Sequence, residues 1–413
     1  LPIFEASLYG TPAIVTAWGG AMDLCTADNA YLLDYAFTEA GSHLPVHDSA
    51  WAEPSVTHLV ELLKQVRQIP LEERSARADR LKAAVEARCQ WAAVMNRHKG
   101  VLDLIRDSEV CRPRIGWITT FGERCGIATT TEMMIQAMDA PAPVVFSRKD
   151  VGVPVTMDHR DIRSITVFPS WDECGFYGIL DAVTHYRLQC VVIQFVYPFY
   201  DYDALSELID ALDQLGVVVV VELHESEPPR YSLERHLRHL LSVLSRVDRV
   251  LVHSVNALND LKALGLVENV TWFPLGVKLP PMAPQPSDTQ PDWVTRIDTV
   301  ARSDQVLIAS YGFFLPHKGL IELIEVVHRL VQSGEAIHLL LLNAEYPSPI
   351  SRQAIEAAES AIRRFGLNDR VTLVTEFLED DVALDVLKRA NLLVFPYRTT
   401  EQGASGAVRF GLA

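Results

Sequence analysis

The stretch Val217-Val-Val-Val-Val-Glu-Leu-His224 is the most informative in the chain, because it is an almost uninterrupted run of β-branched residues. Such a run favours extended backbone, and its length is that of one buried strand. A strand that is apolar on both faces is typical of a parallel sheet with helices on either side. Amphipathic helices are predicted before and after it, near 202–215 and 233–246.

The same alternation of strands and helices extends in both directions from this run. Around it, the sequence predicts strands at 115–119, 191–196 and 249–253, and helices near 127–138 and 175–188. Beyond a Pro-rich stretch at 280–291 a second series follows, with strands at 306–311, 337–343, 370–374 and 392–396 and helices near 317–333, 350–365 and 382–390. We therefore predict an α/β protein with two doubly wound Rossmann-like domains, at 114–280 and 304–413, joined by a hinge at 281–303.

The segment 1–105 has a different texture and is predicted to be a separate unit. It contains one predicted strand, at 13–16, and three helices, which begin near residue 54 and then cover 71–88 and 90–105. A polar linker at 106–113 follows. The chain begins without Met and stops within what resembles a new helix, so we expect a fragment whose second domain is incomplete at its C-terminus.

Composition and charge narrow the classes of function. The 413 residues include 37 Lys and Arg against 53 Asp and Glu, which gives a formal net charge of −16. Nucleic-acid binding and polybasic membrane anchoring are disfavoured, because both need clustered cations. No apolar run reaches the roughly 18 residues of a membrane-spanning helix. The six cysteines form no CxxC pair, which predicts neither a zinc nor a redox motif and is typical of the reducing cytoplasm.

Two Gly-rich turns follow predicted strands. Gly122-Glu-Arg-Cys-Gly126 opens a helix, where backbone amides can hold an anion or a polar sugar. The alternative is an ordinary tight turn. Glu401-Gln-Gly-Ala-Ser-Gly406 is similar, with Ser405 as a candidate N-cap and with side chains that can hold hydroxyls of a sugar or ribose. The alternative there is an ordinary capped helix.

Two single residues stand at the ends of predicted strands. Lys318, in Tyr311-Gly-Phe-Phe-Leu-Pro-His-Lys-Gly319, opens a helix and opposes its dipole, which a bound diphosphate would offset. The alternative is a solvated surface lysine. His224 ends the central strand, where an imidazole can bond hydroxyls or stabilise a developing charge, and the alternative is a structural histidine. His253 repeats this pattern more weakly, and we interpret it as structural.

The chain opens with Leu1-Pro-Ile-Phe-Glu-Ala-Ser-Leu-Tyr-Gly-Thr-Pro12. This string predicts a short helix that ends at Gly10. Glu5 on that helix can accept two vicinal hydroxyls, such as those of a ribose.

These strings together resemble the family 4 retaining glycosyltransferases, which have the GT-B fold of two Rossmann-like domains facing a cleft. The opening string resembles the second half of a family motif, with Glu5 as its second glutamate. Residues 114–413 resemble a second copy, in which Leu223-His224-Glu225 and Lys318-Gly319 match landmarks in the expected order. The resemblance implies a fragment of a tandem enzyme, with 1–105 as the C-terminal part of a preceding unit.

The implied reaction is transfer of a sugar from a nucleotide-diphosphate sugar to a hydroxyl acceptor with retention, in polysaccharide or glycan assembly. The resemblance implies a metal-independent, hexosyltransferase-like enzyme of the cytoplasm that needs no cofactor and acts on a saccharide or glycolipid acceptor, with peripheral membrane contact allowed. Its implied residues are His224 in catalysis, Gly122, Arg124 and Gly126 on the acceptor side, and Lys318, Gly319, Glu401, Gln402, Gly403, Ser405, Gly406 and Glu5 on the donor side.

The second copy departs from the family pattern in two places. Phe313 and Phe314 occupy the region where the family has an Arg before its lysine, and Arg409 or Phe410 stands where a second glutamate is expected. These departures leave open a non-catalytic unit that binds saccharide or scaffolds an active partner. A nucleotide-sugar epimerase is the alternative within the same fold.

The two ends of the chain match the same place in the family pattern. We therefore expect 1–105 to dock onto 304–413 as in a circular permutant, with strand 13–16 extending the second sheet next to 392–396 or a neighbour.

Overall fold

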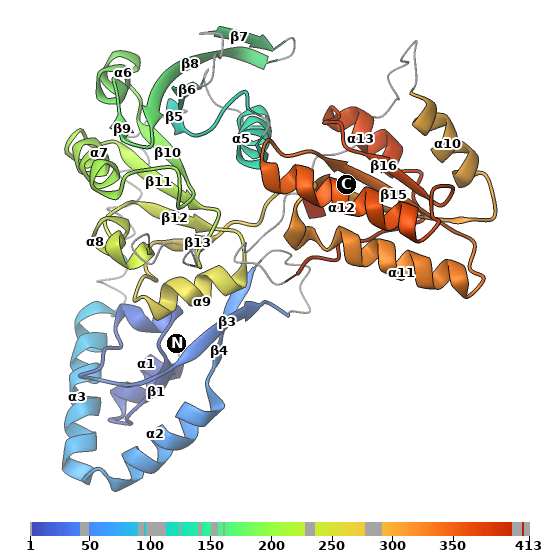
Figure 1. Ribbon diagram of the computed structural model, residues 1–413. Helices are drawn as coiled ribbons and strands as arrows, with labels where there is room; N and C mark the ends of the chain where they lie inside the picture. The colour runs from blue at the N-terminus through green and yellow to red at the C-terminus, as the bar shows by residue number, and fades with distance from the viewer. Residues whose placement is uncertain are drawn as a thin grey trace.

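The computed structural model describes residues 2–41, 49–89, 95, 113–123, 125–138, 143–149, 156–159, 162–227, 236–276, 291–398 and 407–408. Figure 1 shows three bodies in the order of the chain. They are an N-terminal body, a large sheet with helices on both faces, and a second sheet that also has helices on both faces. None of the helices in this described part of the chain is long and apolar enough to cross a membrane.

The large sheet has the strand order β13-β12-β11-β10-β5-β6-β8-β7, and β9 pairs with β8 beside this path. All pairings are parallel except those of β8 with β7 and with β9. The strand order reverses between β5 and β10, which makes this pair the topological switch point. The strands are β5 (Ile115–Ile118), β6 (Val144–Arg148), β7 (Thr156–His159), β8 (Ile162–Asp172), β9 (Gly175–Phe176), β10 (Cys190–Phe195), β11 (Val218–Leu223), β12 (Arg249–Val252) and β13 (Val270–Trp272).

Separate apolar clusters cover the two faces of this sheet, as continuous apolar strands require. The helix α5 (Gly126–Ala137) packs on one face through Ile135. The opposite face carries a larger cluster with α6 (Ile179–Tyr186), α7 (Tyr202–Gln214), α8 (Leu241–Leu244) and α9 (Val255–Ala263). The central strand and its neighbours are therefore confirmed, whereas β6 and β8 were not predicted. The helix predicted near 233–246 contains only a 3₁₀ turn and α8 in its described part.

The second sheet is parallel throughout and has the order β16-β15-β14-β17. Its switch point is the β14–β17 pair. The central strand β15 is buried at every position. The strands are β14 (Val306–Phe313), β15 (Ile337–Ala344), β16 (Val371–Val374) and β17 (Leu392–Leu393), and the helices are α10 (Asp292–Ala301), α11 (Leu320–Gln332), α12 (Pro349–Arg364) and α13 (Asp380–Leu387).

Part of the predicted hinge belongs to this second body. Within 281–303, residues 292–301 form α10, whose Ile297 and Val300 are buried in the same apolar cluster as β14. The remaining hinge residues up to 290, most of the predicted helix 90–105 and the linker 106–112 lie outside the described residues.

The N-terminal body has its own small sheets. The predicted strand is confirmed as β1 (Ile14–Thr16), but it pairs in parallel with β2 (Tyr31–Leu33) in a two-stranded sheet. An antiparallel pair of strands, which the sequence did not predict, follows it. The further elements are α1 (Pro2–Leu8), β3 (Tyr35–Glu39), β4 (Ala50–Pro54), α2 (Val56–Gln68) and α3 (Leu71–Arg88).

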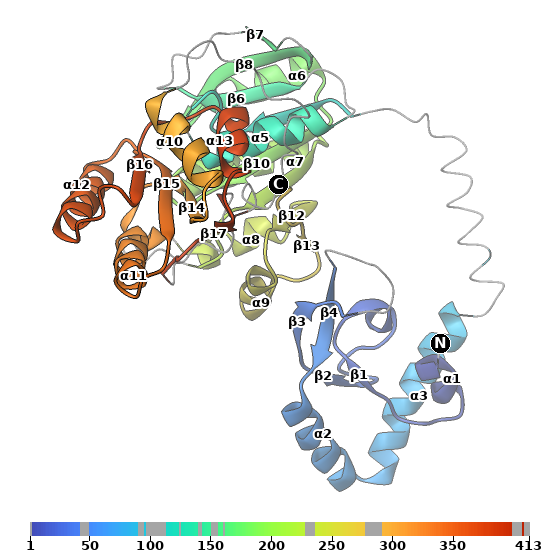
Figure 2. The ribbon, with the colours of Figure 1, turned by 90° about the vertical axis from the view of Figure 1, so that its right-hand side faces the viewer.

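The predicted docking of 1–105 onto 304–413 is wrong. Figures 1 and 2 both show the N-terminal body against α9 of the large domain, apart from α11, α12 and α13. The reason is a specific edge contact, because the side-chain amide of Asn259 accepts from Phe37 N at 2.7 Å and donates to Phe37 O at 3.0 Å. Lys262 adds an ion pair with Asp34 at 2.6 Å. The unpaired edge of β3 is thus satisfied by a helix of the first Rossmann-like domain.

Candidate functional site

Four polar residues gather at the carboxyl ends of three neighbouring strands of the large sheet. Gln194 of β10 and Glu222 of β11 are direct cross-strand partners, and both side chains are fully buried. His224 directly follows β11 and His253 directly follows β12. Because parallel strands end at one edge, the register of β10, β11 and β12 brings these side chains together next to the switch point.

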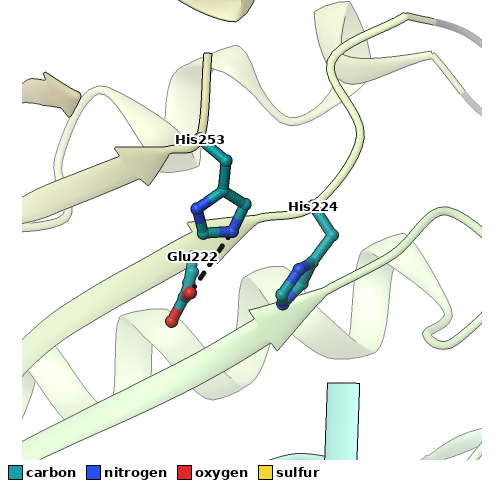
Figure 3. Close-up of side chains that lie close together, drawn as sticks. All are labelled: Glu222, His224 and His253. Carbon is teal, nitrogen blue, oxygen red and sulfur yellow. Dashed lines mark ion pairs between the residues drawn. The ribbon is translucent and has the colours of Figure 1, made fainter. Parts of the chain in front are cut away.

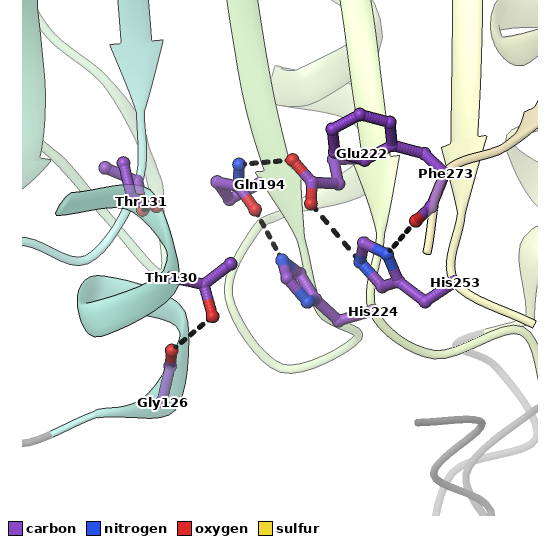
Figure 4. Close-up of polar contacts among 9 residues, drawn as sticks. Gly126, Thr130, Thr131, Gln194, Glu222, His224, His253 and Phe273 are labelled. Atoms are coloured by element: carbon purple, nitrogen blue, oxygen red, sulfur yellow. Dashed lines mark hydrogen bonds and ion pairs between the residues drawn. The ribbon is translucent and has the colours of Figure 1, made fainter. Parts of the chain in front are cut away.

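The four side chains form one line of polar contacts, which Figure 4 shows, and Figure 3 shows the ion-pair contact between Glu222 and His253 within it. Gln194 Nε2 donates to Glu222 Oε2 at 2.7 Å, and Gln194 Oε1 contacts His224 Nε2. The other carboxylate oxygen, Oε1, lies 3.3 Å from His253 Nε2. His253 Nδ1 in turn donates to the backbone carbonyl of Phe273 at 2.8 Å.

Burial shifts the pKa values of two residues in this cluster, Glu222 and His224. Loss of solvent raises the pKa of Glu222 to about 7, although the hydrogen bond from Gln194 opposes the rise. Loss of solvent, and then the neighbouring His253, lowers the pKa of His224 to about 3. His224 is therefore neutral at physiological pH, and its ring can act there as a hydrogen-bonding group but not as a cation.

The same cluster offers donor atoms of the kind that bind metal ions. One ligand atom each from Glu222, His224 and His253 lies within 4.8 Å of the others. However, Gln194 already bonds both Glu222 Oε2 and His224 Nε2, and the remaining oxygen of Glu222 faces His253. Glu222 Oε1 and His253 Nε2 form an ion-pair contact at 3.3 Å rather than a hydrogen bond, so we interpret the cluster as a polar network of two Gln194 hydrogen bonds and this contact.

The first Gly-rich turn lies on the other side of the switch point. Gly122 has φ +68°, a left-handed conformation that favours glycine, and α5 begins at Gly126. The turn is anchored by a hydrogen bond between the hydroxyls of Thr119 and Thr131 at 3.0 Å. Figure 4 shows Gly126 and Thr130 in the first turn of α5, on the same side of the strands as His224. Arg124 lies outside the described residues.

Lys318 occupies the corresponding place in the second domain. It lies in a 3₁₀ turn (Pro316–Lys318) between β14 and α11, and only 8% of it is exposed. Its Nζ lies 3.9 Å from the ring centroid of Tyr397, and burial lowers the pKa of Lys318 to about 8. In the part of the chain that the structure describes, no carboxylate forms an ion pair with this ammonium group. The solvated surface lysine that we considered is therefore not what the structure shows.

Gly319 brings the two loops of this switch point into contact. Its φ is +68°, and a Cβ atom there would lie 1.9 Å from the backbone oxygen of Pro396. Only glycine fits this approach, which holds Pro396 and Tyr397 after β17 against the turn that carries Lys318. Arg398 N also donates to His317 O at 2.9 Å.

The structure brings some of the predicted site residues together and leaves others apart. The predicted donor-side residues Glu401, Gln402, Gly403, Ser405 and Gly406 lie outside the described residues. Glu5 belongs to α1, and both ribbon views show α1 apart from β14 and α11.

Sequence reasoning missed Gln194, Glu222 and Tyr397. A signal for the first two was present, because each interrupts an otherwise apolar strand near its carboxyl end. A polar residue buried in such a strand needs a partner.

No family model and no curated protein matches this chain. Among solved structures, it is similar to a sucrose-phosphate synthase from Thermosynechococcus elongatus, with 16% identity over 71% of this chain and 77% of that chain and a TM-score of 0.51. It is also similar to a glycosyltransferase from Rickettsia africae ESF-5, with 13% identity over 69% of this chain and 73% of that chain and a TM-score of 0.50. At such identities the likeness shows the fold alone. The predicted fold class, two Rossmann-like domains of the GT-B type, is confirmed.

Proposed function

We propose that residues 114–413 form a glycosyltransferase unit that moves a sugar from a nucleotide-diphosphate donor to a hydroxyl acceptor with retention of configuration. The observation that carries this proposal is Lys318, a nearly buried ammonium group at the switch point of the second sheet. Burying a cation is costly unless an anion accompanies it. A diphosphate bound at this turn would supply that anion and would raise the pKa of Lys318 again.

The proposed chemistry needs charge stabilisation on the departing diphosphate. The Lys318 ammonium would provide it electrostatically, in a site that excludes water. The Tyr397 ring lies 3.9 Å from Nζ, a cation–π contact that would help to hold the ammonium group in place. His224, neutral at the edge of the first sheet, would hydrogen-bond a hydroxyl of the transferred sugar or of the acceptor. The acceptor would be a saccharide or a glycolipid headgroup that enters beside the Gly122–Gly126 turn.

A specific observation favours the non-catalytic alternative. Phe313, in the region where the family pattern has an Arg, packs edge-on against Tyr346 with ring centroids 5.2 Å apart and stacks with Phe377 at 6.1 Å. Phe314 is buried in the core. This aromatic cluster offers no second cation for a diphosphate, so the unit would bind a nucleotide or saccharide without efficient transfer.

Calorimetric titration of the full chain with UDP, ADP and GDP tests the binding step. Lys318→Ala should weaken nucleotide-diphosphate binding at least tenfold, since a charge-assisted hydrogen bond contributes roughly 1.5–3 kcal/mol. Lys388→Ala, which removes an exposed lysine of the same domain, is the matched control and should leave the affinity unchanged. Equal affinities for the wild type and Lys318→Ala would remove Lys318 from the site.

Turnover separates the two candidate functions. A glycosyltransferase should release nucleotide diphosphate from a nucleotide sugar, slowly with water and faster with the correct acceptor. Proton NMR of the product would report whether the anomeric configuration is retained. Tight nucleotide binding without release of nucleotide diphosphate, across a panel of donors, would support the non-catalytic unit.

A further inference from the structure

The Gln194–Glu222–His253 network includes two polar side chains that are buried within the large sheet. Gln194 and Glu222 are both fully buried in strands that are otherwise apolar, and they lie directly opposite each other. Apolar residues of similar size would fill the same positions without the need for any partner. Hydrogen bonds and one ion-pair contact, between Glu222 and His253, link the side chains in a line from the Phe273 carbonyl to His224, which suggests a task beyond packing.

The direction of each hydrogen bond follows from the chemistry of the groups. The Phe273 carbonyl can only accept, so His253 Nδ1 carries a hydrogen atom. His253 Nε2 and Glu222 Oε1 face each other at 3.3 Å in an ion-pair contact, which a proton on either atom makes favourable. In both cases the second oxygen, Oε2, accepts from Gln194 Nε2.

The Gln194 amide extends this order of donors and acceptors to His224, the last residue of the line. Since the NH₂ group of Gln194 faces Glu222, its oxygen faces His224 Nε2, and an amide oxygen can only accept. We propose that Gln194, Glu222 and His253 act as positioning residues that hold His224 in its Nε2–H tautomer. His224 Nδ1 is then the acceptor that the ring offers to a ligand.

The bare nitrogen points away from the network. Figure 4 shows the second ring nitrogen of His224 pointing away from Gln194, and His224 is only partly buried. The low pKa of His224 agrees with a neutral ring in which one nitrogen has no proton. A bare Nδ1 accepts from a hydroxyl and rejects a group that can only accept, such as a phosphate oxygen. For the glycosyltransferase proposed above, on which this role rests, the ligand group is a hydroxyl of the sugar or the acceptor.

The tautomer can be measured without any assay of activity. In the full chain labelled with ¹⁵N-histidine, two-bond ¹H–¹⁵N correlations distinguish an Nε2–H ring from an Nδ1–H ring. His224→Asn identifies the His224 signals by their loss. The ring of His338, buried against Thr372 in the second domain, is an internal reference that no variant should change.

The proposal predicts different tautomers of His224 in two variants of the network. Glu222→Gln preserves the polarity, because its amide oxygen can accept from Gln194 while its NH₂ donates to His253, so His224 should keep the Nε2–H tautomer. Gln194→Leu removes the acceptor, and His224 should then show both tautomers. An Nδ1–H ring in the wild type, or an unchanged Nε2–H ring in a folded Gln194→Leu, would overturn the proposal. If Gln194→Leu fails to fold, an Nδ1–H ring in Glu222→Gln overturns it instead.

Kinetics provide the second readout. Gln194→Leu should lower kcat about tenfold, the effect of one hydrogen bond, while the KM for the nucleotide sugar stays within about twofold. Glu222→Gln, which keeps the donor–acceptor order of the line, should lower kcat less than Gln194→Leu does. A wild-type chain without transfer activity would count against the proposed function, whereas the tautomer measurement would still test the network.

Discussion

Substitution of Gly319 by Ala tests the architecture that holds the proposed donor site together. A Cβ atom at this position would lie 1.9 Å from the Pro396 oxygen, whereas ordinary contacts begin at 3.4 Å, so the two loops must separate by well over an ångström. The left-handed backbone of residue 319 adds a cost of roughly 1–2 kcal/mol for a non-glycine residue. We expect a total loss of about 2–4 kcal/mol in the free energy of opening of this region.

Gly366→Ala is the matched control for this substitution. Its φ is +65°, nearly that of Gly319, but a Cβ atom at residue 366 would meet nothing within 4 Å. The control therefore has the backbone cost without the collision, and the difference between the two variants isolates the contact with Pro396. Any gain from a less flexible unfolded chain is the same in both variants.

Hydrogen exchange followed by mass spectrometry provides the assay, since it reports the opening of separate regions in a chain with several bodies. Gly319→Ala should increase exchange in peptides from β14 and β17, and it should weaken nucleotide-diphosphate binding at least tenfold, because Tyr397 moves away from Lys318. Gly366→Ala should bind as the wild type does. If the two alanine variants show equal exchange and equal affinity, the close approach of these loops has no part in the site.

Three further predictions concern the first domain and its neighbour. His224→Ala should reduce transfer strongly, while the free energy of unfolding falls by only about 1 kcal/mol, the cost of leaving Gln194 Oε1 without a partner. A large loss of stability in this variant would instead indicate that His224 is a structural residue. The pKa of Glu222 is raised in the folded state from 4.5 to about 7, so this carboxyl should make the wild type progressively less stable as the pH rises from 4.5 to 7. In Glu222→Gln this loss of stability should be absent, which urea unfolding at each pH would measure. Parallel pH profiles for the two proteins would contradict the raised pKa. Asn259→Ala removes both hydrogen bonds to Phe37 and should increase hydrogen exchange in 35–39 by the equivalent of about 1–3 kcal/mol, with Asn391→Ala, in the second domain, as a control that leaves 35–39 unchanged.

The sequence predicted the strands of both sheets where the apolar runs are long. Residues 191–196, 217–223 and 337–343 were recognised because burial on both faces needs only a local run of β-branched and aliphatic residues. The strands β6 and β8 were missed, since Val144–Arg148 ends in polar residues and Ile162–Asp172 contains a proline. Local composition is a weaker indicator for such strands, whose pairing partners provide much of their stability.

Part of the candidate site could likewise be predicted from the sequence, and part of it could not. His224, Lys318 and the Gly122–Gly126 turn could be located from sequence, because each stands at the end of a recognisable strand, and the strand ends of a parallel sheet share one edge. Chain order alone could not show that Gln194 lies opposite Glu222, because 28 residues separate them and only the register of β10 on β11 makes them neighbours. The collision that reserves position 319 for glycine likewise depends on Pro396, in a loop that the sheet order brings back beside β14.

The N-terminal body shows most clearly what the sequence alone could not predict. The family pattern led to the expectation that 1–105 completes the second sheet, yet its strand β1 pairs with β2 and its edge strand β3 is bonded by Asn259 of α9. A lone asparagine on a helix carries no signal in sequence that it will serve as the partner of a strand more than 200 residues away. Local runs specify which segments become strands and helices, because that choice depends on burial and backbone preference within each segment. The partners of those segments depend on contacts between residues far apart in the chain, and these exist only once the whole molecule has folded.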